Sequence, residues 1–251
     1  INLKKSNANY NIAPSISPDG DNIAFYSNQD GIMSLCLMSS DCKKCEEEAI
    51  KKILTGDMSA NIEEFHILKP GISWSPDSKK LLVAVKSKGQ DVLFIINLEK
   101  GYKKEKLTFK NSLKAILQPS WNPIFYNWIA FIGSNGVQSD VYLFNLDSKE
   151  LINVTNDVFT DQHVSWSTDG KNLLFSSDRA SNLGNDEDKK SDGWGQQYDL
   201  YSISLDMVNN KDFIYNPLKR LTNTPSDEFY PINLKSSNLF AFISNDNGIN
   251  N

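Results

Sequence analysis

Hydrophobic residues fall in short runs along the whole chain, and turn-forming residues separate these runs. Residues 72–85, ISWSPDSKKLLVAV, contain two such runs around a Ser-Pro-Asp turn. Short runs rich in Val, Ile, Leu and aromatic residues, bounded by Gly, Asn, Asp or Ser, predict β-strands. Because no stretch of about ten residues shows convincing helical spacing, we expect an all-β fold.

The same phrase returns at several places, which indicates internal repeats. It reads ISPDGDNIAFYS from Ile16 and VSWSTDGKNLLFSS from Val164. Each copy has an anchor residue two positions before the proline of the turn or its equivalent. A second apolar run follows the turn. The anchors are Ile16, Trp74, Trp121, Trp166 and, more weakly, Asn233, at separations of 58, 47, 45 and 67 residues.

Two further runs complete each repeat. The third runs include DVYLFNLD and DLYSISLD, which are close copies of one another, and the fourth runs end in Leu-Thr or Val-Thr. The third runs are residues 34–38, 92–98, 141–146 and 200–205, and the fourth runs end at Thr55, Thr108, Thr155 and Thr222.

Four strands in roughly 45 residues match one blade of a β-propeller. A β-sandwich would also contain short strands, but it gives no reason for a Trp-Ser-Pro-Asp phrase at every fourth strand. We therefore predict one β-propeller domain over residues 1–251, built of four-stranded antiparallel blades. Five blades are visible, or six if the chain is part of a larger ring. The predicted blade units are approximately residues 12–55, 70–108, 117–155, 162–222 and 229–251, the last completed by residues 1–5.

The repeated phrase predicts structural roles for its residues. The first strand of a blade is expected to lie innermost, where a Trp fills the gap between two twisted sheets. In the turn, Pro fixes φ, Asp bonds to its own backbone and Gly accepts a positive φ. The residues with these expected roles are Trp74, Trp121 and Trp166 for packing, and Asp19, Asp77 and Asp169 for turns.

Three segments, SPDGDNIAFYSNQDG, SWSPDSKKLLVAV and SWSTDGKNLLFSSDR, resemble the repeats of TolB-like propellers of bacterial Tol–Pal systems. Similar repeats occur in the propeller domains of prolyl oligopeptidase-type and tricorn-type peptidases. The resemblance covers nearly the whole chain and implies the fold, because the shared residues form a turn and a packing position. It also implies a location in the bacterial periplasm or cell envelope. Two features depart from TolB: no segment corresponds to its N-terminal α/β domain, and five units are visible where TolB has a ring of six.

Charge and length narrow the classes of partner. The chain has 251 residues, 26 of them Lys or Arg, and a formal net charge of −5. Nucleic acid requires a concentrated basic surface, which this sequence lacks. The longest apolar run, residues 92–98, is too short to span a membrane, so contact with the cell envelope would pass through a partner. Because the chain begins with Ile1 and shows no signal peptide, we expect a mature form or a fragment.

The three cysteines lie close together in the sequence. Cys42 and Cys45 form a C-x-x-C pair, for which a local disulfide and two unpaired loop thiols both stay open. A zinc site would need a second pair or suitably spaced histidines, so we expect no metal. A thioredoxin-type redox motif would need a βαβ unit, which the strand pattern does not contain.

The four strands of a blade are lettered A to D along the chain. The D–A loops join one blade to the next, and the B–C loops join the second strand to the third. We expect partner contacts on the face that these two sets of loops share. Rigid scaffolds place binding residues on such loops. The polar insertion 180–197 includes Trp194, a residue type that anchors interfaces. Alternatively, Trp194 folds back onto its own blade and the other candidates are solvated rim residues. Those candidates, expected immediately before two first strands, are Asp161, His163, Asp227 and Tyr230.

No catalytic arrangement is evident in the sequence. Neither His66 nor His163 has a marked nucleophile nearby, and no G-x-S-x-G motif occurs. The acidic residues 185–188 do not fit a calcium-binding loop. We therefore predict a non-enzymatic scaffold without a cofactor that binds a protein or peptide, as the TolB resemblance implies. Two alternatives stay open: the substrate-gating propeller of a multidomain peptidase, and a propeller that binds a small ligand or sugar.

Overall fold

Every regular element that the structure describes is a β-strand, which confirms the all-β prediction. The structure is a computed structural model, and no described helix could cross a membrane. The chain divides into two units, residues 1–121 and 122–251, which are described separately. The described residues are 10–41, 50–56, 62–67, 69–109, 113–179, 197–208, 212–215, 217–234, 239–246 and 249–250.

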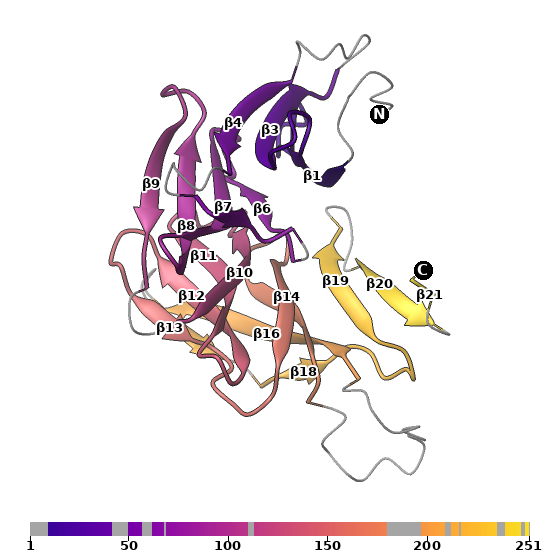
Figure 1. The fold of residues 1–251 in the computed structure, drawn as a ribbon. Coiled ribbons are helices and arrows are strands. Elements are labelled where there is room, and N and C mark those ends of the chain that lie inside the picture. The colour runs from indigo at the N-terminus through magenta and orange to yellow at the C-terminus, as the bar shows by residue number, and fades with distance from the viewer. Residues whose placement is uncertain are drawn as a thin grey trace. The chain divides into compact units, whose positions relative to one another are not determined.

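The first unit contains two antiparallel sheets whose strands mostly follow chain order. The first sheet has the order β1-β2-β3-β4. In the second sheet β7, β8 and β9 lie side by side, and both β5 and β6 pair with β7 (Figure 1). The strands are β1 (Asn11–Ile16), β2 (Asn22–Ser27), β3 (Ser34–Ser39), β4 (Lys51–Thr55), β5 (Glu64–Phe65), β6 (Ile72–Trp74), β7 (Lys80–Ser87), β8 (Gln90–Asn97), β9 (Lys103–Leu107) and β10 (Ala115–Trp121).

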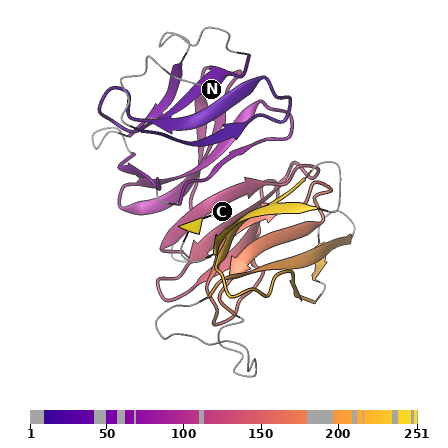
Figure 2. The same cartoon turned by 90° about the vertical axis from the view of Figure 1, so that its right-hand side faces the viewer.

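The second unit repeats this antiparallel order, and its last strands, β19 and β20, lie side by side in yellow (Figure 2). The sheet orders are β10-β11-β12-β13, which begins with the last strand of the first unit, β14-β15-β16-β17 with β18 also on β16, and β19-β20-β21. The five sheets agree with the five predicted blades. The strands are β11 (Trp128–Ser134), β12 (Ser139–Asn145), β13 (Leu151–Asn153), β14 (Asp161–Trp166), β15 (Asn172–Ser177), β16 (Asp199–Val208), β17 (Asp212–Tyr215), β18 (Lys219–Arg220), β19 (Glu228–Asn233), β20 (Phe240–Asp246) and β21 (Ile249–Asn250).

Burial follows the position of each strand in its sheet. Residues 81–85 of β7 and 92–96 of β8 are all buried, because these central strands are covered on both faces. Their apolar runs are therefore continuous rather than alternating. The outer strand β9 is exposed at every position except Leu107. In the first unit, one core joins Tyr26 and Leu35 of the first sheet with Val83 and Phe94 of the second. Burying one such side chain contributes about 1.5–3 kcal/mol.

The repeated turn is stabilised by hydrogen bonds from its own Ser and Asp side chains. Between β6 and β7, the Ser75 hydroxyl donates to Asp77 Oδ1 at 2.5 Å and accepts the Lys80 amide at 2.9 Å. The same Asp77 oxygen accepts the Lys79 amide at 3.1 Å. A serine and an aspartate therefore hold the turn from within. The same 2.5 Å bond joins Ser17 to Asp19 and Ser167 to Asp169.

One copy departs from the phrase and makes a longer turn. Asn122 stands where the other turns have Ser, and its Oδ1 accepts the amides of Ile124 at 2.9 Å and Phe125 at 2.8 Å. The backbone bond that closes this turn runs from Asn122 N to Trp128 O. Its two ends are one residue further apart than in the other turns, so the strand after Trp121 starts one residue later.

The three tryptophan anchors are buried, and two of them form a hydrogen bond with the first strand of the preceding sheet. Trp74, Trp121 and Trp166 each have only 6% of their surface exposed. Trp74 Nε1 donates to the carbonyl of Ser15 in β1 at 3.1 Å, and the Trp121 amide donates to Ser73 Oγ in β6 at 2.8 Å. Indole packing and these bonds join neighbouring first strands in the first unit.

Candidate functional site

Four of the five first strands have a positive φ three residues before the anchor position. In β14 the register with β15 shifts around His163, whose φ is 56°. In β19 the register with β20 shifts around Tyr230, whose φ is 54°. Residues with side chains rarely adopt a positive φ, and such a backbone costs on the order of 1–3 kcal/mol. The equivalent positions in β1 and β10 are Ala13 and Gln118, each with a φ of 52°.

A glycine, Gly71, stands at the equivalent position directly before the remaining first strand, β6, and its φ is not positive. A Cβ built on Gly71 would lie 2.5 Å from Pro119 Cδ and 2.7 Å from Gln118 Cα. No side chain fits there without a shift of β10. Bulges redirect side chains and recur beside functional sites. The four positions with a positive φ therefore differ mainly in the side chain that each one presents.

In the second unit, the bulges bring aromatic side chains together. The rings of His163 and Tyr230 are 3.9 Å apart between centroids, and those of His163 and Phe229 are 5.2 Å apart at 70°. Tyr198, just before β16, packs on Phe229 at 5.5 Å. His163 is buried, whereas Tyr230 has 40% of its surface exposed. The cluster of Tyr198, His163, Phe229 and Tyr230 is called the aromatic cluster below.

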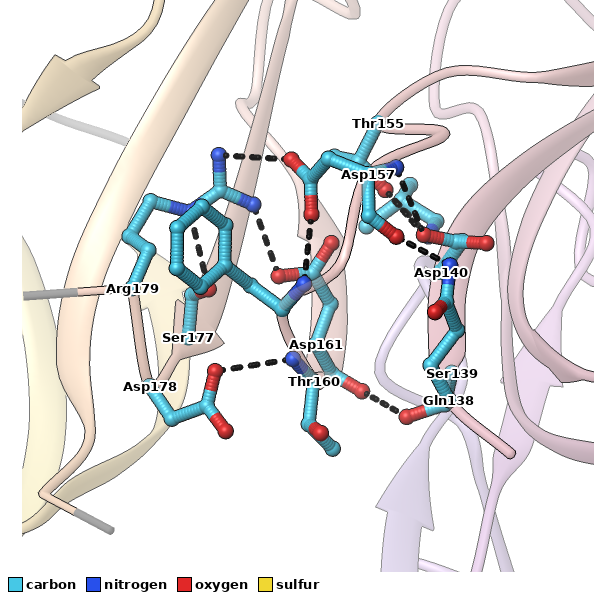
Figure 3. A network of polar contacts seen from close by, with 12 residues as sticks. Gln138, Ser139, Asp140, Thr155, Asp157, Thr160, Asp161, Ser177, Asp178 and Arg179 are labelled. Atoms are coloured by element: carbon cyan, nitrogen blue, oxygen red, sulfur yellow. Dashed lines mark hydrogen bonds and ion pairs between the residues drawn. The ribbon is translucent and has the colours of Figure 1, made fainter. Parts of the chain in front are cut away.

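A buried network of charged groups lies beside β14 (Figure 3). Arg179 donates from Nη2 to Asp161 at 2.9 Å and from Nε to Ser177 at 2.8 Å, and its Nη1 lies 3.2 Å from Asp157. Its guanidinium also lies 5.1–5.5 Å from three ring centroids, an arrangement that stabilises a desolvated cation. Burial raises the pKa of Asp161 to about 6, although Arg179 acts to lower it.

Further polar groups fix the backbone on both sides of Asp161. Ser139 Oγ, at the start of β12, donates to the Asp161 carbonyl at 2.8 Å. Asp178 Oδ1 accepts the Thr160 amide at 2.8 Å (Figure 3). The connection into β14 is thus held by Ser139 of β12 and by Asp178, which follows β15 directly.

An aspartate at the start of the third strand recurs in three sheets, and sequence reasoning missed it. Asp91 Oδ2 accepts the amide of Ile116 at 3.0 Å, and Asp140 Oδ2 accepts Asn153 Nδ2 at 3.0 Å. Asp199 is fully buried and binds Arg220 at 2.7 Å. The signal was present in the close copies DVYLFNLD and DLYSISLD, whose shared first residue is this aspartate.

The start of β19 carries two more carboxylates with different partners. Asp227 Oδ1 accepts the Tyr198 amide at 2.9 Å, and its Oδ2 lies 3.4 Å from Asn245 Nδ2. Glu228 is fully buried, and its Oε1 accepts the hydroxyl of Thr224. These carboxylates therefore border the aromatic cluster through Tyr198.

The structure places the predicted contact residues in one part of the second unit. Asp161 and His163 lie two residues apart in β14, Tyr230 lies in β19, and Asp227 directly precedes β19. The predicted turn residues Asp19, Asp77 and Asp169 lie at the opposite ends of the first strands. Trp194, Cys42 and Cys45 lie outside the described residues. Cys36 is buried, and burial raises the pKa of its thiol to about 11.

Two other features belong to the first unit. His66 Nε2 lies 3.2 Å from Asp91 Oδ1. A hollow of about 300 Å³ lies between the β2–β3 loop and residues 63–67, lined by Ile32, Met33, Phe65 and Ile67 among others. Among the described residues, no group of three His, Cys, Asp or Glu side chains could hold a metal ion.

Comparisons with known proteins find similarity in structure. No model of a protein family matches the sequence, and no curated protein matches it. A structure assigned as TolB from Agrobacterium tumefaciens is 16% identical, with a TM-score of 0.58 over 85% of this chain and 64% of that one. TolB from Acinetobacter baumannii is 14% identical, with a TM-score of 0.59 over 96% of this chain and 53% of that one. The tricorn protease is 13% identical, with a TM-score of 0.54 over 94% of this chain and 23% of that one.

These likenesses concern the fold, since all three identities are below 17%. The chain spans 64% and 53% of the lengths of the two TolB structures. Its antiparallel sheets of about four strands, which follow one another along the chain, are the units that these structures share with it. The chain therefore has the fold of a TolB-like β-propeller.

Proposed function

We propose that this chain is a non-enzymatic scaffold that binds a protein or peptide at the aromatic cluster and its neighbouring carboxylates. The proposed contact residues are Asp161, His163, Asp227 and Tyr230. The TolB-like fold supports the scaffold role, and the resemblance of the repeats to TolB favours a place in the bacterial periplasm or cell envelope.

One observation carries this proposal. His163 and Tyr230 occupy equivalent positions in β14 and β19, both with a positive φ, and their rings meet at 3.9 Å. Strained backbone of this kind persists where the surroundings hold it, and it is concentrated at functional sites. Tyr230 presents 40% of its surface to solvent, and exposed Tyr side chains are enriched among residues that anchor interfaces.

The test is partner capture by the immobilised chain from an extract of its native source. We expect Tyr230→Ala to lose one or more proteins that the unaltered chain retains, with identification by mass spectrometry. Tyr126→Ala is the matched control, since Tyr126 is 56% exposed in the turn before β11, at the other end of the strands. Equal capture by both variants and by the unaltered chain would remove the aromatic cluster from the binding surface.

Trp194, in the insertion that precedes β16, is a further proposed contact. Because an interface Trp contributes to binding more than to folding, we expect Trp194→Ala to weaken capture while the melting temperature stays nearly constant. A large fall in melting temperature, with binding unchanged, would instead place this indole in the fold of its own sheet.

A further inference from the structure

The surroundings of the aromatic cluster carry more negative than positive charge. Among the described residues around it stand the carboxylates Asp157, Asp161, Asp178, Asp227 and Glu228, with the guanidinium of Arg179. Arg179 is already engaged by Asp157 and Asp161, and the nearby Arg220 binds Asp199 at 2.7 Å. The hydrogen bonds of Asp227 and Glu228 within the described residues are instead with neutral groups, among them the Tyr198 amide and the Thr224 hydroxyl.

Two of these carboxylates have a buried oxygen with no hydrogen-bond partner in the described chain. They are Asp161 Oδ2 and Glu228 Oε2, and both residues are 0% exposed. The two residues stand at equivalent positions, five residues before Trp166 and Asn233, in strands that pack against each other. Asp161 already pairs with Arg179 through Oδ1, and Glu228 accepts the Thr224 hydroxyl through Oε1. Their second oxygens are buried without a hydrogen bond, which is unfavourable, so a cation near this end of the two strands would be attracted.

The negative charges converge on Tyr198, a part-exposed member of the aromatic cluster. Burial raises the pKa of its hydroxyl, and the charges of Asp178, Asp227 and Asp161 raise it further. The Tyr198 ring also packs on Phe229 at 5.5 Å. A cation beside these rings would gain both carboxylate attraction and a cation–π contact.

Building on the proposed function, we infer that the partner inserts a lysine or arginine side chain beside Tyr198 and Phe229, where Asp227 pairs with its charge. Asp161 and Glu228 add attraction from the buried side of the site. Lysine and arginine both carry a long apolar stem that can lie along the aromatic rings while the charged end reaches a carboxylate. The partner surface is therefore basic where it meets this unit.

The first experiment uses small probes and the whole chain. The probes are N-acetyl-lysine methylamide and N-acetyl-arginine methylamide, with the norleucine and citrulline derivatives as uncharged controls. Amide chemical shifts are followed by nuclear magnetic resonance during titration at low and high salt. We expect saturating shifts around Tyr198, Phe229 and Tyr230 with the charged probes alone, and weaker binding at high salt because exposed ion pairs are screened.

The variants remove one negative charge at a time and leave the shape of the side chain nearly unchanged. Asp227→Asn keeps an oxygen that can accept the Tyr198 amide but removes the charge, and we expect about twofold to fivefold weaker binding of the charged probes. Asp147→Asn is the control, since Asp147 is exposed in the turn after β12 at the other end of the sheet. Glu228→Gln tests the buried charge in the same way and should weaken binding in the same direction.

The outcomes separate this inference from the proposed function. Three results would overturn the inference of a basic side chain. They are equal shifts with charged and uncharged probes, shifts only in other parts of the chain, and equal affinity of Asp227→Asn and Asp147→Asn for the charged probes. In each case Tyr230→Ala could still abolish partner capture, and the scaffold proposal would stand. If Tyr230→Ala leaves capture unchanged, the scaffold proposal fails whatever the probes do.

Discussion

Asp161→Asn should change how the stability of the protein depends on pH. Asp161 is buried, and its pKa in the folded chain is raised from 3.8 to about 6. The folded state therefore binds a proton more tightly than the unfolded state. The proton on Asp161 therefore adds about 3 kcal/mol to the free energy of unfolding below pH 3.8, and this contribution is lost as the pH rises through 6. Asparagine has no such proton, so the variant should lack this part of the slope.

The assay is urea unfolding between pH 4 and 7, with the free energy of unfolding plotted against pH. Between pH 4 and 7 the unaltered chain should lose about 2.4 kcal/mol more than Asp161→Asn does, since part of the full effect lies below pH 4. The pKa of Asp19 is lowered from 3.8, chiefly by the Ser17 hydroxyl, so this carboxylate changes stability at more acidic pH. Asp147→Asn, at an exposed turn, should follow the unaltered chain. Parallel curves for the unaltered chain and Asp161→Asn would refute the reasoning, because burial would then not govern the proton on Asp161.

Two other substitutions test the interior of the second unit. Arg179→Met leaves Asp157 and Asp161 without their cation, and we expect a loss of about 3–5 kcal/mol in urea unfolding, against little change for Lys171→Met in an exposed turn. A loss no larger than that of the control would mean that the ion pairs of Arg179 contribute little to the stability of the fold. Trp166→Ala truncates an indole that is 6% exposed, which should cost about 3–5 kcal/mol and lower the melting temperature by about 10 °C. An unchanged melting curve by circular dichroism would contradict its packing role.

The sequence predicts the middle strands of each sheet well, because their signal is local. Runs such as residues 81–85 and 92–96 are apolar without interruption, and both strands are buried as that pattern indicates. The turn phrase is equally local, since Ser75 and Asp77 lie two residues apart and bond directly. A pattern that needs no distant partner can be recognised from residue types alone.

The bulges and the charged network could not be predicted in this way. The residue types of Tyr230, Gln118 and Ala13 give no indication of a positive φ, which glycine and asparagine adopt far more readily. The pairing of Arg179 with Asp157 and Asp161 joins positions 22 and 18 residues apart, and only the folded chain brings them together. Likewise, the pairing of β17 with β16 and of β5 with β7 lengthens two sheets beyond the predicted runs.

The missing side chain at Gly71 has an effect beyond its own strand. Because its α-carbon lies so near the backbone of Gln118 and the ring of Pro119, even one methyl group would push β10 away from β6. Gln118 occupies the strained position of β10, so that displacement would reach the conformation of that residue as well. The absence of a side chain at Gly71 therefore sets the spacing between β6 and β10 and, through that spacing, the backbone conformation of Gln118.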